Sequence, residues 1–357
     1  MTLPQDNKLD ISRLAQIYNN TVATYKFYWF VAILDIVVKK QQRQMSVWEI
    51  VVGMIAEAWY PIHYFRLSFG KSDSLYDRII TIQQTLNIPI DANKDDIKNT
   101  LVAKLDDREF KRIIRIFKQN VPYWFLSPWI TTSYDVRVVM FLSEQWTNNC
   151  PYAIHGETIE INPKWLQYLN DNYLILRDFS FWNLTLFLQK RNPNVPDLPS
   201  KLVKPILRDS LTKQRHFWDT FIEINGSIQC IYTGKILHKK AYDLDHFIPW
   251  SFVSHNLLWN LLPADSSINS SKSNNLPPLE IYLKPFAQMH HKAIKEIFPK
   301  KPNDKLFEDY LTLHNSIPEL LQLSDSDFLN IFKKTVSPLV QIAENMGFRY
   351  WTNSLTT

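Results

Sequence analysis

An aspartate and a histidine stand side by side at Asp245 and His246, and two asparagines follow them at set distances. Asn260 lies 14 positions after His246, and Asn269 lies 23 positions after it. Histidine is the side chain whose ordinary pKa lets it take a proton from water near neutral pH. Carboxylate and amide oxygens are the ligands that hard divalent cations prefer. These residue types therefore predict a hydrolytic reaction that a metal ion assists.

Hydrolysis of a phosphodiester bond requires such a set of groups. A water molecule must lose a proton, and negative charge develops on the phosphate and on the leaving oxygen, where a divalent cation neutralises it. Mg²⁺ is usually held by few protein oxygens and keeps several of its waters. We therefore predict that His246 is the general base and that Asp245 and Asn269 hold Mg²⁺ or Mn²⁺.

The geometry of a β-strand sets a condition on this prediction. Adjacent residues of a strand point to opposite faces, so Asp245 and His246 can reach one phosphate only if the strand ends at this point. Ile248 and Pro249 follow directly, and a proline cannot continue the hydrogen bonding of a strand interior. The sequence thus predicts a strand that ends where its two functional residues stand.

Residues 242–252 read Tyr-Asp-Leu-Asp-His-Phe-Ile-Pro-Trp-Ser-Phe. This run resembles the Tyr-Asp-x-Asp-His-(Ile/Phe)-x-Pro-x-Ser-Phe run in the HNH lobe of the RNA-guided CRISPR effector nucleases. The spacing of 23 positions from His246 to Asn269 also agrees with that lobe. Residues 228–277 therefore resemble the HNH, or ββα-metal (His-Me finger), endonuclease family.

The resemblance implies roles for further residues. Asn260 would tie the loop to the strand that carries His246. Lys272, one turn after the metal-binding asparagine, would face the phosphate backbone. Asp243 and Asn274 would contact the metal ligands without binding the metal themselves.

Many HNH proteins also bind a structural zinc ion through two CxxC pairs. Here Cys230 keeps the first position, Thr233 replaces its partner, and no cysteine follows in the chain. We therefore expect no structural zinc, and we expect Cys230 to lie in the core of the first strand.

Several polar side chains near these motifs are candidates for contacts with a nucleic-acid backbone, which would make binding depend on salt. They lie on the predicted hairpin, on the helix that precedes it and after the last motif residue: Lys235, Lys239, Lys240, Arg208, Arg215 and Asn274. The neighbouring His290 and His291 have no carboxylate at a suitable spacing for a metal site, and we expect them on a solvated helix face.

Short strands and helices must position these residues. Residues 227–232 and 241–246 are strand-like and are predicted to pair as a β-hairpin with a long loop. A short polar helix is expected over 264–272. Helices over 281–297, 306–313 and 325–346 would then pack around this module.

The N-terminal half is predicted to be helical, with an aromatic-rich helix over 12–38 and a second one that Ser46 caps. Prolines cluster in residues 191–206, which suits a linker. We therefore expect a helical recognition or partner domain at 1–190 and an HNH nuclease domain at 207–357, with its core at 228–277. The fold class is mainly α with a small α+β module.

The bulk composition agrees with a polyanion partner but does not demand one. The formal net charge is +5, and the two cysteines, Cys150 and Cys230, are too few for a disulfide framework. The most apolar stretches, 27–34 and 47–59, are shorter than a membrane span requires or carry charges. Residues 1–10 have no apolar core typical of a signal peptide. We expect a cytoplasmic protein that has no membrane partner.

The sequence thus favours a metal-dependent endonuclease that hydrolyses DNA, in the style of a bacterial anti-phage or restriction effector. One alternative is an RNA-cleaving nuclease or toxin with the same chemistry. Another is a non-catalytic nucleic-acid-binding subunit of a larger complex. The N-terminal domain would recognise DNA, a partner subunit, a defence-system protein or a trigger.

Overall fold

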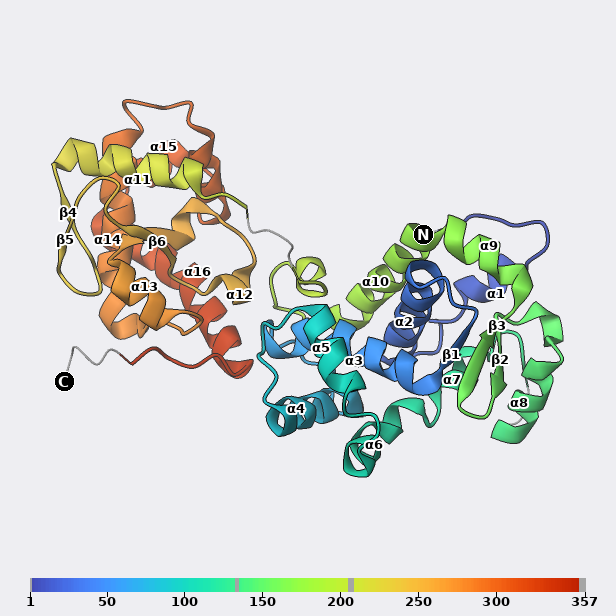
Figure 1. Ribbon diagram of the computed structural model, residues 1–357. Coiled ribbons are helices and arrows are strands. Elements are labelled where there is room, and N and C mark those ends of the chain that lie inside the picture. The colour runs from blue at the N-terminus through green and yellow to red at the C-terminus, as the bar shows by residue number, and fades with distance from the viewer. Residues whose placement is uncertain (1, 132–134, 205–208, 353–357) are drawn as a thin grey trace. The chain divides into compact units, whose positions relative to one another are not determined.

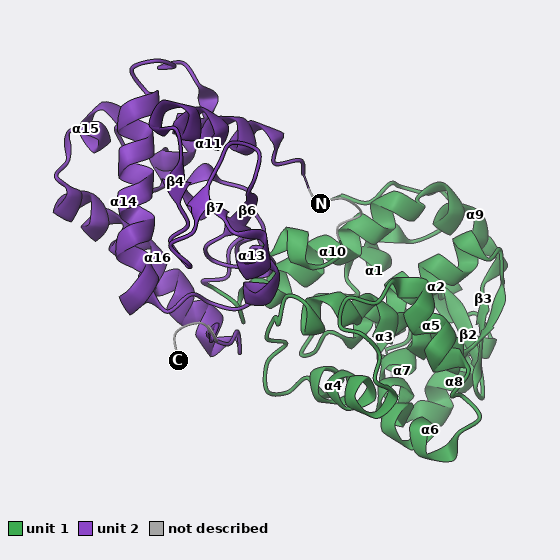
Figure 2. Ribbon diagram, turned by 60° about the vertical axis from the view of Figure 1, so that its left-hand side comes forward, with its two compact units in different colours: residues 1–193, 198–204 green, residues 194–197, 205–357 purple. Residues whose placement is uncertain are grey.

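Helices α2 (Tyr25–Lys39) and α3 (Val47–His63) are apolar on nearly every side, and this composition buries both of them in the computed structural model. The structure describes residues 2–131, 135–204 and 209–352. The chain forms two units, which Figure 2 distinguishes by colour: unit 1 comprises Met1–Pro193 and Leu198–Lys204, and unit 2 comprises Asn194–Asp197 and Pro205–Thr357. Both units are mainly helical, and each has its own core.

The core of unit 1 is the contact between α2 and α3 (Figure 1). Trp29 and Trp59 are fully buried there. The prediction of one helix over 12–38 was wrong, because a break separates α1 (Ile11–Ala15) from α2. At this break, the backbone N–H and the hydroxyl of Thr24 both donate to Asp73, each at 2.7 Å.

Shorter helices surround this pair, and several of them begin at a capping side chain. Asn93, for example, accepts hydrogen bonds from the backbone N–H groups of Asp95 and Asp96. The surrounding helices of unit 1 are α4 (Ser74–Leu86), α5 (Lys94–Val102), α6 (Arg108–Ile114), the 3-10 helix η1 (Arg115–Lys118), α7 (Val121–Phe125), α8 (Val136–Glu144), the 3-10 helix η2 (Thr147–Asn149), α9 (Pro163–Asp171), α10 (Tyr173–Gln189) and the 3-10 helix η3 (Pro199–Lys201).

Unit 1 also contains a small antiparallel sheet with the strand order β1-β3-β2. Its strands are β1 (Gln44–Ser46), β2 (Tyr152–His155) and β3 (Thr158–Ile161). Along β3, the central strand, half-buried and buried residues alternate. Ser46 ends β1 and then caps α3, because its side chain accepts from the Trp48 backbone N–H at 3.2 Å.

Unit 2 begins with α11 (Thr212–Asn225), and two separate strand pairs follow it. β4 (Ile228–Gln229) pairs with β5 (Ile236–Leu237), and β6 (Asp243–His246) pairs with β7 (Leu261–Ala264). The predicted pairing of 227–232 with 241–246 was therefore wrong. Each of these segments instead pairs with a partner strand that the prediction did not include. We call β6, β7 and the following α13 (Ser266–Lys272) the ββα module.

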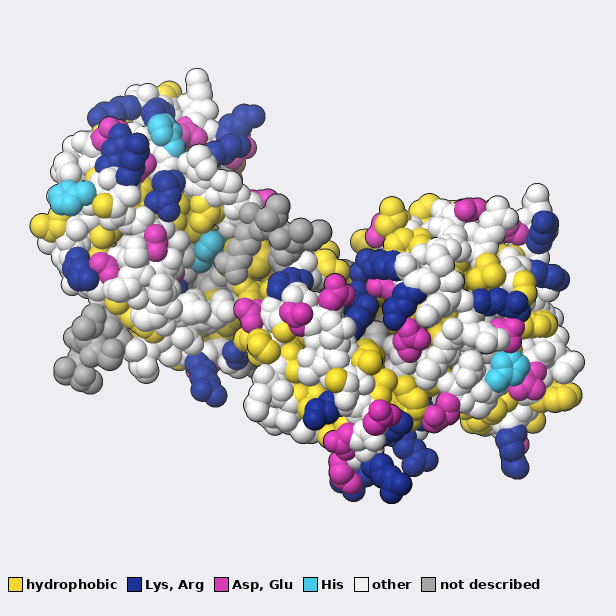
Figure 3. Space-filling model, viewed as in Figure 1, with side chains coloured by type: hydrophobic (Ala, Val, Ile, Leu, Met, Phe, Trp, Pro, Cys, Tyr) yellow, Lys and Arg dark blue, Asp and Glu magenta, His cyan; other side chains and the backbone are white. Residues whose placement is uncertain are grey.

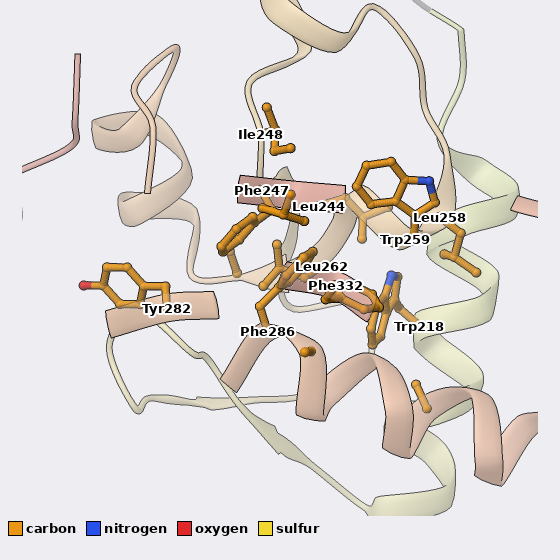
Figure 4. Close-up of a cluster of buried hydrophobic side chains, with 14 of the residues drawn as sticks. Trp218, Leu244, Phe247, Ile248, Leu258, Trp259, Leu262, Tyr282, Phe286 and Phe332 are labelled. Carbon is orange, nitrogen blue, oxygen red and sulfur yellow. The ribbon is translucent and has the colours of Figure 1, made fainter. Parts of the chain in front are cut away.

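The C-terminal helices pack against this module and contribute buried residues to its core. They are α14 (Leu279–Ile297), the 3-10 helix η5 (Lys305–Thr312), α15 (Ile317–Gln322) and α16 (Asp325–Asn345). Directly after β6, Phe247 stacks on Phe286 of α14 with ring centroids 3.9 Å apart, and Phe332 of α16 packs against Phe286 (Figure 4). This aromatic packing anchors the end of β6 on α14 and α16.

His290 and His291 belong to this core, so the expectation of a solvated helix face was wrong. They are 0% and 2% exposed. His290 contacts the Tyr310 hydroxyl at 2.7 Å, and His291 contacts an Asp325 carboxylate oxygen at 2.7 Å. In the part of the chain that the structure describes, no helix is long and apolar enough to cross a membrane.

Candidate active site

The end of β6 carries both Asp245 and His246. β6 pairs with β7 up to His246, which lies opposite Leu261, and the Phe247 N–H then donates to the Asn260 carbonyl at 2.8 Å. Neighbouring residues of a strand leave it on opposite sides. Asp245 is accordingly buried, at 3% exposure, whereas His246 is partly exposed.

Asn260 fixes the path of the chain just beyond this strand end. It belongs to the 3-10 helix η4 (Leu258–Asn260), which leads into β7, and it is fully buried. Its Oδ1 accepts from the Ile248 N–H and its Nδ2 donates to the Ile248 carbonyl, both at 2.9 Å. One side-chain amide thus pairs both backbone polar groups of the buried Ile248, which holds the segment after β6 against η4.

Asp245 lies among hydrogen-bond donors on the buried side of β6. The Tyr232 hydroxyl donates to its Oδ2 at 2.7 Å, and the Lys272 ammonium lies 3.1 Å from Oδ1 and 3.0 Å from Oδ2. Burial raises the pKa of Asp245 from its ordinary value, and the nearby Lys272 charge and the Tyr232 hydrogen bond oppose that rise. Tyr232 was not singled out from the sequence.

Lys272 does not lie where the sequence placed it. We expected it to face a phosphate backbone, but its side chain is fully buried. In addition to Asp245, its Nζ contacts the His246 carbonyl at 2.6 Å. Three oxygens at the end of β6 therefore converge on one ammonium group, so the ion pair joins α13 to β6.

Asn269 lies on α13, three residues before Lys272. Residues three apart share one face of a helix, so Asn269 lies on the face that packs toward β6. Its side chain is partly exposed, and among the described residues its amide has no hydrogen-bond partner. Asp265 caps this helix by accepting from the Ser267 N–H at 3.1 Å.

The His246 ring is oriented by a loop residue, Asn256. His246 Nε2 lies 2.9 Å from Asn256 Oδ1, and an amide oxygen only accepts, so the neutral ring carries its proton on Nε2 and its lone pair on Nδ1. Gln214 of α11 donates to the Asn256 carbonyl at 2.9 Å. Asn256 was not identified from the sequence, because its contact with His246 depends on how the loop folds back on the strand.

The side chains present are suited to a hard divalent cation. Asp245 offers a carboxylate and Asn269 an amide oxygen, which are ligands that such a cation prefers. The Asp245 carboxylate and the His246 carbonyl already bind one positive group, the Lys272 ammonium. A cation bound at Asp245 would share that carboxylate with Lys272. Within the described ranges, no group of three or more His, Cys, Asp or Glu is placed to hold a metal, so the set depends on an amide ligand.

Most of the predicted phosphate-binding cations form ion pairs or hydrogen bonds with other residues of unit 2. Lys235 pairs with Asp265 at 3.1 Å, and Lys239 pairs with Glu223. Arg215 donates to the Tyr242 carbonyl at 2.9 Å.

The remaining predicted positions are more varied. The Lys240 backbone N–H donates to Asp219 at 3.2 Å, and its side chain is exposed. Asn274 accepts from the Ser251 hydroxyl at 2.9 Å, and Asp243 is partly buried at the start of β6. Arg208 lies outside the described residues.

Cys230 is buried after β4, at 1% exposure. Its Sγ accepts from the Asp265 N–H at 3.5 Å, and its carbonyl accepts from the Gly234 N–H at 2.8 Å. Gly234 has a φ of 71°, a conformation that glycine adopts without strain, and this allows the tight turn between β4 and β5. The cysteine thus has a place in the packing of the turn.

Comparison with known proteins finds similarity in the segment that carries these residues. The family described as HNH endonuclease matches residues 230–278. A 57-residue segment is 40% identical to the CRISPR-associated endonuclease Cas9 of Listeria innocua serovar 6a, and it covers 15% of this chain and 4% of that protein. No solved structure matches the chain.

Proposed function

We propose that this chain, which carries an HNH endonuclease domain at residues 230–278, is a metal-dependent endonuclease that hydrolyses phosphodiester bonds of DNA. The observation that carries the proposal is the end of β6. There Asp245 and His246 are adjacent, and Asn260 fixes the backbone directly after them. A buried carboxylate and a partly exposed imidazole at one strand end suit a metal ligand and a general base.

His246 is the proposed general base. Because Nε2 donates to Asn256, Nδ1 of the neutral ring takes the proton from the attacking water. Gln214 holds the Asn256 backbone and thereby keeps the imidazole in one orientation. Asn256 is a positioning residue in this scheme.

Asp245 and Asn269 are the proposed ligands of Mg²⁺ or Mn²⁺. When bound, such a cation neutralises the charge that develops on the phosphate and on the leaving oxygen. Lys272 holds the Asp245 carboxylate and the end of β6 in place and adds a positive charge beside them. Asn260 keeps the strand end rigid, so that base and ligands stay at constant distances.

DNA is the substrate that we favour, in the context of a bacterial anti-phage or restriction effector. The support is the similarity to a protein named as a CRISPR-associated endonuclease, of which this chain covers only a small part. The same chemistry would also cleave RNA, and that alternative is decided by experiment. The activity and partners of the whole protein therefore belong to the proposal.

Cleavage of matched substrates tests the proposal directly. Supercoiled plasmid and a transcript of the same sequence are incubated with the purified chain in Mg²⁺, in Mn²⁺ and in EDTA. We expect the plasmid to be cut with either metal and to stay intact in EDTA, and we expect the transcript to survive. Cleavage of the transcript alone would make the chain an RNA nuclease.

A folded protein that cuts neither substrate with either metal would favour a non-catalytic subunit instead. Gel filtration with the products of neighbouring genes, followed by the same assay on any complex, then separates two cases. Cleavage that appears only in the complex, and that His246→Ala abolishes, retains the catalytic role of this site. Absence of cleavage there as well would overturn it.

A further inference from the structure

Unit 1 contains a basic pocket that lies outside the site described above. We propose that this pocket binds the phosphate backbone of a single nucleic-acid strand, as a second nucleic-acid site of the chain. Its volume is about 350 Å³, which lies near the lower end of ligand sites and can admit one nucleotide. It is lined by five cations, one aromatic ring and one carboxylate: Arg108, Lys111, Arg112, Arg115, Lys118, Trp48 and Glu157.

The cations come from one continuous segment, α6 and η1, which spans Arg108–Lys118. Positions 108, 112 and 115 follow one another at helical spacing, and so do 111, 115 and 118. The five charged groups therefore form one ridge. In Figure 3, Lys and Arg side chains gather around α6, with acidic side chains beside them.

Trp48, at the start of α3, orders the two lysines. The Lys118 ammonium lies 4.4 Å from the centre of the indole ring, and the Lys111 ammonium lies 5.7 Å from it. The indole N–H donates to Glu157 at 2.8 Å, and Glu157 also pairs with Lys118. The hydrogen bonds from Lys118 and from Trp48 hold the pKa of Glu157 below its ordinary value, so this carboxylate is charged and offsets the charge of Lys118.

The arginines of the ridge are less engaged. Among the described residues, neither Arg108 nor Arg115 has a carboxylate partner. Arg112 pairs only with Glu109 at 2.9 Å, and both side chains are more than 70% exposed, so that pair is weak. Asp107 is occupied as the N-cap of α6, where it accepts from two backbone N–H groups. Most of the positive charge of the ridge is therefore available to bind an external anion.

A strand suits this pocket better than a small anion does. Five cations exceed the charge of one phosphate, whereas successive phosphates of a strand can meet them in turn. A concave basic surface with an aromatic wall is the combination that proteins use for single strands. The alternative, a solvated helix face without a ligand, predicts that removal of any two exposed cations of unit 1 has the same effect on binding.

The test measures binding of a fluorescein-labelled single-stranded DNA of about 20 nucleotides to the full chain in EDTA, over a range of salt concentrations. Arg108→Ala/Arg115→Ala is compared with Arg137→Ala/Lys190→Ala, which removes the same charge from exposed positions of unit 1 outside the pocket. We expect the first variant to bind about tenfold more weakly. Its slope of log affinity against log salt should fall by about 1.4, because each phosphate contact with a single strand contributes roughly 0.7.

The control variant should keep the affinity and the slope of wild type. Equal losses in both variants, or an unchanged slope in Arg108→Ala/Arg115→Ala, would overturn the proposal. Displacement of the strand by AMP at the same nucleotide concentration would also overturn it and would indicate a mononucleotide site. Because EDTA excludes metal-dependent cleavage from the assay, loss of the nuclease proposal would leave this result unaffected, and the reverse also holds.

Discussion

Positive charge is used differently in the two units. Around the end of β6 in unit 2, the ammonium of Lys272 is buried and bonded to Asp245 and to the His246 carbonyl. In the basic pocket of unit 1, Arg108 and Arg115 are exposed and have no carboxylate partner among the described residues. Buried, bonded charge fixes geometry, whereas exposed charge without a partner attracts an anion. We infer that hydrolysis takes place at the end of β6 in unit 2, whereas much of the affinity for nucleic acid comes from the basic pocket of unit 1.

The largest expected effect follows from removal of the buried cation. Lys272→Met leaves the Asp245 carboxylate buried without its charge partner, so the free energy of unfolding should fall by about 3–5 kcal/mol. Urea unfolding measures the loss. Lys235→Met is the matched control, because its pair with Asp265 is exposed and should contribute less than about 1 kcal/mol.

Metal addition sharpens this comparison. If Asp245 is a metal ligand, millimolar Mg²⁺ or Mn²⁺ should raise the unfolding temperature of Lys272→Met more than that of wild type, because the cation then compensates the unpaired carboxylate. Equal shifts in the two proteins would argue against Asp245 as a ligand. Equal stability losses in Lys272→Met and Lys235→Met would contradict the structural role of the buried pair.

The two asparagines should separate stability from activity. Asn260→Ala leaves the backbone N–H and carbonyl of the buried Ile248 without their side-chain partners, so the free energy of unfolding should fall by about 2–4 kcal/mol. Asn269→Ala removes a partly exposed amide with no described partner, so stability should change by less than about 0.5 kcal/mol. Under the proposed function, Asn269→Ala nevertheless loses metal-dependent cleavage. Chemical unfolding and plasmid cleavage on both variants check this, and full activity of Asn269→Ala would remove it from the site.

In this region the sequence predicted single elements better than the pairing of the strands. The strand end at His246, the polar helix with Asn269 and the buried position of Cys230 all follow from local patterns. β7 was missed because Leu261–Ala264 is buried throughout and contains Pro263, so it lacks the alternation that marks a strand.

Two contacts of the strand end were not predicted from the sequence, because they depend on the paths of the loops. Asn256 meets His246, and Tyr232 meets Asp245, only after the loops have folded back. His290 appears polar in sequence but lies among aromatic rings of α14 and α16.

The buried His290 gives a pH dependence to unit 2. Burial lowers its pKa from the ordinary 6.5 to about 3. As the pH falls below 6.5, the unfolded chain takes up a proton that the folded chain refuses, so stability is lost toward acid at about 1.4 kcal/mol per pH unit. Between pH 7 and pH 5, wild type should therefore lose about 2 kcal/mol more than His290→Phe does, measured by urea unfolding. Parallel losses would show that His290 is not the group responsible.

The smallest expected effect concerns the exposed lysines of unit 2. Lys235 and Lys239 are already paired with Asp265 and Glu223. Their joint replacement by alanine should lower the salt slope of strand binding by less than the replacement of Arg108 and Arg115 does, since their charge is partly neutralised. A larger drop in slope for the lysine pair would reverse the contrast between the two units.

The central claim is that His246 performs the chemistry, and one measurement tests it most directly. The rate of plasmid cleavage at saturating enzyme is compared for wild type, His246→Ala and His238→Ala, and plasmid binding is measured in parallel. His238 is an exposed histidine of the same domain. We predict that His246→Ala binds the plasmid as wild type does but cleaves it at least about 100-fold more slowly. His238→Ala should bind and cleave the plasmid as wild type does. Cleavage by His246→Ala at the wild-type rate would contradict the account.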